Sequence, residues 1–111
     1  MLTLIAPVAT NTVKANLTDI AAGSGYTAGG TATTITSSAQ TAGTYKLVIT
    51  DVTFTASGGS IADFRYVVLY NDTALNDELI GWYDYGATLT ITNGNSFLTD
   101  FDASAGVLTL V

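Results

Sequence analysis

Hydrophobic and polar residues alternate along most of this chain with a period of two, which predicts β-strands. The strongest segment is residues 61–70, where large apolar side chains fall on both faces of the predicted strand. One face carries Phe64, Tyr66, Val68 and Tyr70, and the other carries Val67 and Leu69. This pattern predicts a central strand that is covered from both sides. Arg65 is the exception, and we expect it to pair with Asp63, Asp84 or another strand carboxylate.

Further strands are predicted by the same alternation, at residues 2–6, 31–37, 45–54, 79–85, 88–92, 96–101 and 106–111. Within 45–54 the apolar residues change face, so we expect a bulge or bend near Thr50 and Asp51. Gly86 is expected to end the strand before it. Asn93-Gly94 is the favoured two-residue turn of a β-hairpin. Short strands about ten residues apart are typical of a β-sandwich or small barrel.

One helix is predicted, at residues 13–22. Val13, Leu17 and Ile20 are spaced to share one helical face, and Thr12 is a suitable N-terminal cap. The Thr, Asn and Asp residues inside this segment weaken it as a helix.

These elements predict an all-β fold: one jelly-roll-like β-sandwich domain over residues 1–111, with about seven or eight strands and a short helix near the N-terminus. The two end strands, 2–6 and 107–111, carry no Lys or Pro in their pairing runs, so we expect bare sheet edges there. The predicted core consists of Leu47, Ile49, Phe64, Tyr66, Val68, Tyr70, Leu89, Ile91, Leu108 and Leu110.

Composition removes most chemistry from consideration. The chain has no His and no Cys, which excludes the usual zinc sites, Ser–His and Cys–His nucleophiles and disulfides. Charged residues are 11% and the net charge is −6, with three basic residues, so neither nucleic acid nor an anionic membrane is an expected partner. Thr makes up about a fifth of the chain, which suits strand surfaces. The apolar residues 1–8 have no basic region and are expected to form a first strand, not a signal peptide.

A glycine-rich segment, GSGYTAGG at residues 23–30, surrounds one aromatic residue. Its glycines do not follow the G-x-G-x-x-G order that cradles phosphates. We therefore expect a compact turn with Tyr26 inserted at the edge of the core.

Carboxylates gather in two places. The loop at residues 71–78 offers oxygen ligands of the kind calcium prefers, but not with the spacing of a calcium loop. We expect a solvated loop with a side-chain-capped turn at Asn71 and Asp72. Asp100 and Asp102 form a pair of the kind found in glycosidases, but they are expected to cap the following turn. We assign no catalytic, cofactor-binding or metal-ligating residue, and we expect no enzymatic activity, cofactor or metal.

Aromatic residues concentrate in two segments that are predicted to be central strands. Trp82, Tyr83 and Tyr85 could stack on a sugar if they were exposed, or fill the core if they were buried. Because Tyr83 and Tyr85 alternate with Trp82 and Asp84, one of these two sets must leave the main core.

Three stretches carry a resemblance: GSGYTAGG at 23–30, FRYVVLYNDTALNDELIGWYDYG at 64–86 and FDASAGVLTL at 101–110. In their order and spacing they resemble a set of small structural proteins of tailed bacteriophages. These proteins share a G-x-G-Y-x-A-G-G turn, an R-Y-[AV]-V-[LI]-Y strand, an L-I-G-[WY] strand and a closing F/W-D segment ending in G-[VI]-L.

The resemblance implies a virion structural protein, most simply a decoration or cement protein on the outer surface of the phage head. It implies the major capsid protein as a partner. Apolar surface left exposed on so small a chain, together with the bare end strands, predicts a homo-oligomer, with a trimer favoured on a capsid lattice. The resemblance also implies assembly in the host cytoplasm. The alternative is a receptor- or glycan-binding module of a head fibre or tail, in which the aromatic residues would meet the ligand.

Overall fold

The computed structural model describes residues 1–110, which form eight β-strands and one short 3₁₀ turn. The chain divides into two units: residues 1–30 with 55–96, and residues 31–54 with the described residues from 97 onward. The all-β class predicted from the sequence is confirmed, and antiparallel ladders of the kind that build β-sandwiches link the strands of both three-stranded sheets. That all 111 residues form one domain stays a prediction.

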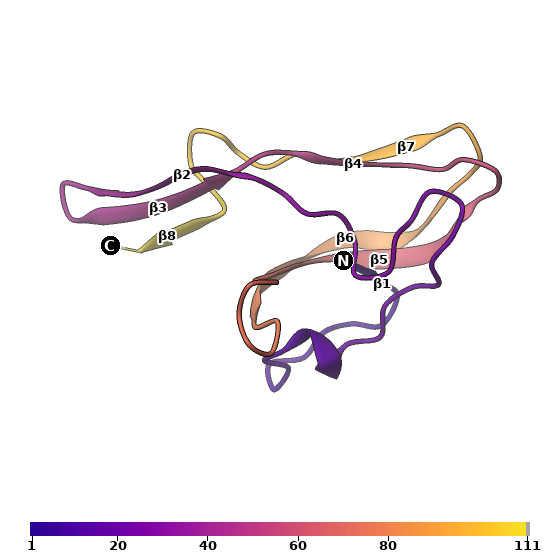
Figure 1. The fold of residues 1–111 in the computed structure, drawn as a ribbon, viewed down its shortest axis with the longest axis horizontal. Helices are drawn as coiled ribbons and strands as arrows, with labels where there is room; N and C mark the ends of the chain where they lie inside the picture. Colours follow the sequence, from indigo (N-terminus) through magenta and orange to yellow (C-terminus); the bar gives the residue numbers. More distant parts are fainter. Residues whose placement is uncertain (111) are drawn as a thin grey trace. The chain divides into compact units, whose positions relative to one another are not determined.

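The first unit is built on a three-stranded sheet with the order β1-β5-β6 (Figure 1). The strands are β1 (Leu2–Thr3), β5 (Ile61–Tyr70) and β6 (Leu79–Ile91), and both ladders are antiparallel. β5 lies in the centre, with Val67 paired to Leu2 on one side and to Tyr83 on the other. Val67 and Val68 point to opposite faces and are both buried, so the predicted double coverage of this strand is confirmed.

The core of the first unit forms around β5. Of the predicted core residues, Phe64, Val68 and Ile91 are buried, whereas Tyr66, Tyr70 and Leu89 are only half-buried. The core residues that are missing from the predicted core list come mainly from outside β5 and β6: Met1, Leu2, Ile20, Tyr26, Ala56, Ile61 and Val67.

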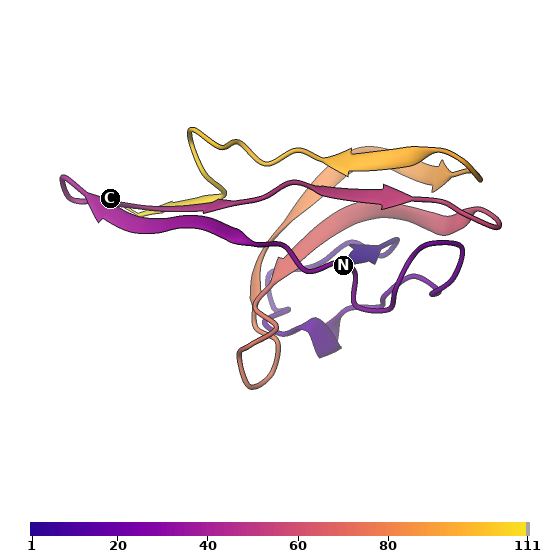
Figure 2. The ribbon, with the colours of Figure 1, turned by 45° about the horizontal axis from the view of Figure 1, so that its top comes forward.

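The second unit holds a three-stranded antiparallel sheet with the order β2-β3-β8 (Figure 2). Its strands are β2 (Ile35–Thr41), β3 (Thr44–Ile49) and β8 (Leu108–Leu110). Ile49 is buried and Leu47 half-buried, but Leu108 and Leu110 are 37% and 60% exposed, so their placement in the core was wrong. β8 is an edge strand that pairs only with β3 in this sheet, which leaves its side chains with fewer neighbours. Val111 lies outside the described residues.

Strand ends show how local chemistry adjusts the pattern. The predicted bend at Thr50 and Asp51 is confirmed, because these residues separate β3 from β4 (Val52–Thr55). The predicted strand at 31–37 begins only at Ile35 and continues to Thr41. The turn that follows places Ala42 and Gly43 in the left-handed region, at φ of +50° and +83°.

Two predictions around β6 were wrong. Gly86 does not end the strand; its φ of +92° falls inside a bulge, where the ladder steps from Tyr66–Asp84 to Phe64–Leu89. Asn93-Gly94 does turn the chain, but β7 (Ser96–Thr99) pairs with β4 instead of forming a hairpin with β6.

The backbone around that turn bonds to another segment. The Gly94 amide donates to the carbonyl of Ala56, and the Ala56 amide donates to the carbonyl of Asn95. These bonds take the place of the ladder that a hairpin would have formed.

The predicted helix at residues 13–22 was also wrong, because only the 3₁₀ turn η1 (Lys14–Asn16) forms. The Asn16 side-chain oxygen accepts the backbone amides of Thr12 and Val13, which closes the chain into a single turn. Further on, the Ile20 amide donates to the carbonyl of Leu2. Side-chain competition and pairing with β1 thus outweigh a weak helical preference.

Removing the two side-chain methyl groups of Val68, in β5, tests this description of the core. Val68→Ala is expected to lower the free energy of unfolding by about 2 kcal/mol, and the melting temperature by roughly 10 °C, because the side chain is buried and leaves a cavity. Leu75→Ala is the control, since Leu75 is 95% exposed, and it should stay within about 0.5 kcal/mol of the parent chain. Equal effects of the two substitutions in urea unfolding would contradict the description.

Candidate functional site

The glycine turn anchors the N-terminal segment to the first sheet. Tyr26 is buried, and its hydroxyl accepts the Leu2 amide at 3.0 Å while donating to a carboxylate oxygen of Asp19 at 2.5 Å. The other oxygen of Asp19 accepts the Gly29 amide at 2.6 Å. The predicted insertion of Tyr26 into the core is therefore confirmed. Burial, followed by the bond to Asp19, raises the pKa of Tyr26, which keeps the hydroxyl protonated.

Close packing explains one of the glycines in this turn. A Cβ atom on Gly25 would lie 2.1 Å from the carbonyl oxygen of Thr55, and the φ of Gly25 is +98°. Only glycine fits this approach without a backbone shift. The segment GSGYTAGG thus joins β1 to the strand region near residue 55, and its role is structural.

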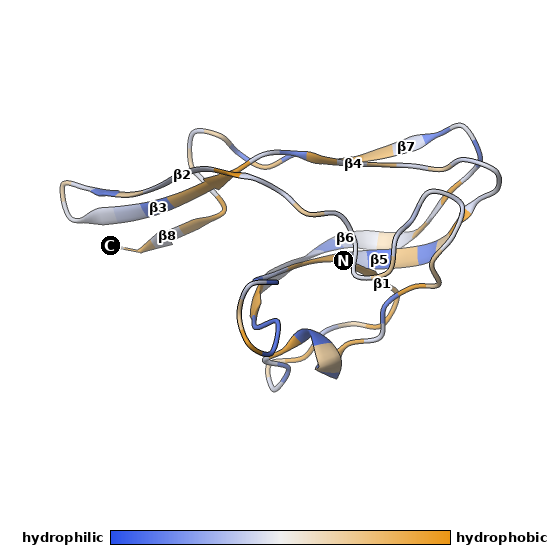
Figure 3. Cartoon of the chain, viewed as in Figure 1, coloured by the Kyte–Doolittle hydropathy of each residue, from blue (hydrophilic) through white to orange (hydrophobic). Residues whose placement is uncertain are grey.

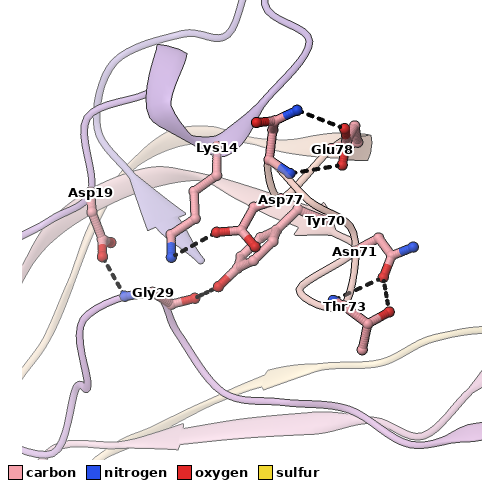
Figure 4. Close-up of polar contacts among 9 residues, drawn as sticks. Lys14, Asp19, Gly29, Tyr70, Asn71, Thr73, Asp77 and Glu78 are labelled. Atoms are coloured by element: carbon pink, nitrogen blue, oxygen red, sulfur yellow. Dashed lines mark hydrogen bonds and ion pairs between the residues drawn. The ribbon is translucent and has the colours of Figure 1, made fainter.

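Lys14 is placed between the glycine turn and the acidic loop (Figure 4). Its ammonium nitrogen lies 3.6 Å from Asp77 and 4.9 Å from the ring centre of Tyr70. The Tyr70 hydroxyl donates to the carbonyl of Gly29 at 2.8 Å. The Tyr70 hydroxyl, and then Asp77, raise the pKa of Lys14, so the ammonium group stays charged beside these two residues. An open groove of about 730 Å³ runs beside this cluster, and its lining includes Leu17 and Leu75.

The acidic loop is held by its own side chains. The Asn71 side-chain oxygen accepts the amide and the hydroxyl of Thr73, at 3.1 and 2.7 Å, which confirms the predicted capped turn at Asn71 (Figure 4). The carboxylate of Glu78 accepts both the backbone and side-chain nitrogens of Asn76. Within residues 1–110, no group of three or more acidic side chains is placed to hold a metal ion.

β6 exposes a row of large side chains. The sequence predicted that either the Tyr83/Tyr85 set or the Trp82/Asp84 set must leave the core. In the structure both sets are exposed. The exposed fractions are 41% for Ile80, 39% for Trp82, 45% for Tyr83 and 56% for Tyr85. We call Ile80, Trp82, Tyr83 and Tyr85 the aromatic row. It is the largest set of exposed apolar side chains on one described strand.

Asp84, which lies between Tyr83 and Tyr85 on β6, forms an ion pair with Arg65. Arg65 donates to both oxygens of Asp84, at 2.8 and 3.1 Å, which confirms the predicted pairing. The guanidinium also lies 5.5 Å from the ring centre of Tyr66. Arg65, and then the Gly86 amide, lower the pKa of Asp84. A carboxylate held in its charged form by two donors is poorly suited to act as a general acid at neutral pH.

The second pair of carboxylates also serves a turn. One oxygen of Asp102 accepts the amides of Ser104 and Ala105, at 2.7 and 2.8 Å, so the predicted capping by Asp102 is confirmed. The Ala105 amide, and then the Ser104 amide, lower the pKa of Asp102. Asp51 accepts the Phe101 amide at 2.8 Å. Asp100 lines an open groove of about 630 Å³ together with Asp51 and Asp102.

Sequence reasoning missed the part played by the first residue of the chain. The α-amine of Met1 donates to the carbonyl of Val68 at 3.0 Å, and the Val68 amide donates back to the carbonyl of Met1 at 2.8 Å. Both residues are buried. The apolar start of the chain was a signal for a strand, but nothing in the spacing pointed to its partner.

Comparison with known proteins adds no assignment: no protein-family model, curated protein or solved structure matches this chain. Among residues 1–110, no helix combines the length and apolarity needed to span a bilayer.

The hydroxyl of Tyr26 can be tested by removal. Tyr26→Phe is expected to cost about 1–3 kcal/mol in unfolding free energy, because it leaves the buried Leu2 amide without its acceptor and removes one of the two donors to Asp19. Tyr45→Phe is a matched control, since the Tyr45 hydroxyl bonds to Ser38 on an exposed surface and should cost much less. Similar losses in chemical denaturation would show that the Tyr26 hydroxyl is not a special anchor.

The buried α-amine predicts a pH dependence of stability. Burial lowers the pKa of the Met1 amine from 8.0 to about 6 in the folded chain. Between pH 6 and 8 the unfolded chain therefore binds more protons, so stability should rise with pH across this window by about 2 kcal/mol. The chain has no His, so no side chain with an ordinary pKa titrates in the same range. Urea midpoints that stay constant from pH 6 to 8, for a chain beginning at Met1, would contradict the prediction.

Proposed function

We propose that this chain is a structural protein of a tailed-bacteriophage particle, a decoration protein that binds the outer surface of the head. The proposal begins from the three segments that resemble small phage structural proteins, at residues 23–30, 64–86 and 101–110. The first of these forms the anchoring turn around Tyr26, and the second spans β5, the acidic loop and most of β6. The resembling segments therefore contain most of β5 and β6, the two longer strands of the first unit, but not β1.

The observation that carries the proposal is the exposure of large apolar side chains on strands at sheet edges. β6 and β8 are edge strands of their three-stranded sheets. β6 carries the aromatic row, and β8 carries Leu108 and Leu110. An edge strand offers unpaired backbone groups to a partner, and exposed apolar side chains beside it add the driving force for association. Such surfaces fit a protein that works by packing against other protein subunits.

The charged residues favour the same interpretation. Several of the carboxylates hold turns or ion pairs within the chain, as Asp84, Asp102 and Asp77 do. With 11% charged residues, much of the surface consists of Thr, Ser and small apolar residues. Protein interfaces are depleted in charged side chains at their centres, so a surface of this composition can be buried at low desolvation cost.

A second candidate function is favoured by the aromatic row itself. Trp82 on one face of β6 and Tyr85 on the other are exposed at 39% and 56%, and exposed aromatic rings are suited to stacking on sugars. In this alternative the chain is a glycan- or receptor-binding module of a fibre or tail. We rank it second because it explains the aromatic row but not the exposed leucines of β8.

Binding to capsids tests the proposal. Phage heads assembled without the protein are mixed with increasing amounts of it and separated by sedimentation. Saturable binding at a fixed ratio to the major capsid protein is expected, because a decoration protein occupies equivalent lattice positions. The matched glycan experiment follows Trp82 fluorescence during titration with host surface polysaccharide, with Tyr85→Ala, which keeps the single tryptophan as reporter, as the control for glycan binding. Heads that bind no protein, together with a saturable fluorescence change, would reverse the ranking.

A further inference from the structure

The sheet of the second unit has one apolar face that the described chain covers only in part. The register pairs Tyr45 with Leu110 and Leu47 with Leu108, so these four side chains lie on one face of the sheet, together with that of Ile49. Figure 3 shows hydrophobic colouring at the end of β3 and along β8. Ile49 is buried, but the exposed fraction rises to 37% at Leu108 and 60% at Leu110. We call the surface formed by Tyr45, Leu47, Leu108 and Leu110 the arm face.

The opposite face of the same sheet carries Lys46 and Thr109 toward its outer end, and the buried Val48 next to Ile49. Lys46 pairs with Thr109 across the ladder, and the Lys46 ammonium donates to the carbonyl of Ser104 at 2.7 Å. Where β3 pairs with β8 the sheet thus has one polar and one apolar face, which is typical of a layer that is solvated on one side and packed on the other. The alternation in β3 and β8 thus indicates a packing partner for the arm face.

The distribution of charge indicates what that partner is. Residues 31–50 contain no Asp or Glu, and neither do residues 103–110, although the whole chain has a net charge of −6. The single cation in these segments, Lys46, lies on the polar face. The arm face is therefore a surface where two copies of this acidic chain can meet without bringing carboxylates together.

We propose that the arm face is a self-association surface, which packs against the arm face of a second copy of this chain. Identical apolar surfaces can pair around a symmetry axis, with Leu108 and Leu110 of each copy removed from water. β2 is suited to the border of such a contact, because all seven of its residues are exposed and uncharged. This inference goes beyond the proposed function, since it concerns contacts between copies and does not require a phage head.

The experiment compares two substitutions at neighbouring positions of β8. Leu110→Asp places a carboxylate in the arm face, and Thr109→Asp places the same carboxylate on the polar face, opposite Lys46. The molar mass is followed by light scattering over a wide range of protein concentration. The parent chain should reach at least twice its monomer mass of 11.4 kDa. Leu110→Asp should weaken association at least tenfold, and Thr109→Asp should leave it within about twofold of the parent.

Several results would overturn the inference. A parent chain that stays monomeric at every concentration excludes self-association. A lower melting temperature of Leu110→Asp would not rescue the inference, because it would show only that the face packs within one chain. Equal weakening by both substitutions would mean that added charge, and not the arm face, controls association. Far-UV circular dichroism checks that the variants fold, and Leu108→Ser replaces Leu110→Asp if the latter does not.

The failure of this inference can be separated from that of the proposed function. An oligomer that ignores phage heads contradicts the decoration function and leaves the self-association surface in place. A strict monomer that saturates phage heads does the opposite.

Discussion

The burial of β5 on both faces is the constraint on which the first unit depends. Phe64, Val67 and Val68 are all buried, and Val67 and Val68 point to opposite faces, so both faces of β5 must be covered. Part of that cover comes from the N-terminal residues. Met1 exchanges two backbone hydrogen bonds with Val68, and Tyr70 bonds to the carbonyl of Gly29. β1 lies about sixty residues before β5 along the chain and the glycine turn about forty, so distant segments help to enclose this hydrophobic strand.

The second unit meets the same constraint only in part. Val48 and Ile49 are buried on opposite faces of β3, but the face of Ile49 becomes increasingly exposed toward Leu110. The hydrophobic effect favours covering such a face, and the absence of carboxylates in residues 31–50 makes another copy an acceptable cover. The first sheet accounts for the fold of its unit, and the second carries the surface that we propose for association between copies.

Much of this could be predicted from local pattern, and the failures have physical causes. Period-two alternation identified β5, and it predicted a strand carboxylate as the partner of Arg65, but only the structure selects Asp84 over Asp63. The helix failed because Asn16 closes a single turn through its side chain, which spacing alone does not reveal. Leu110 was placed in the core because alternation shows which face is apolar but not what covers it. That distinction depends on strand order, which the sequence does not state.

Hydrogen exchange of backbone amides, measured at low and at high protein concentration, tests the division between the two sheets most directly. The account predicts that β5 amides are strongly protected at both concentrations, because their protection comes from within one chain. Amides of β3 and β8 should become more protected as the concentration rises, because copies cover the arm face. Protection of β8 that is independent of concentration, or protection of β5 that depends on it, would contradict the account.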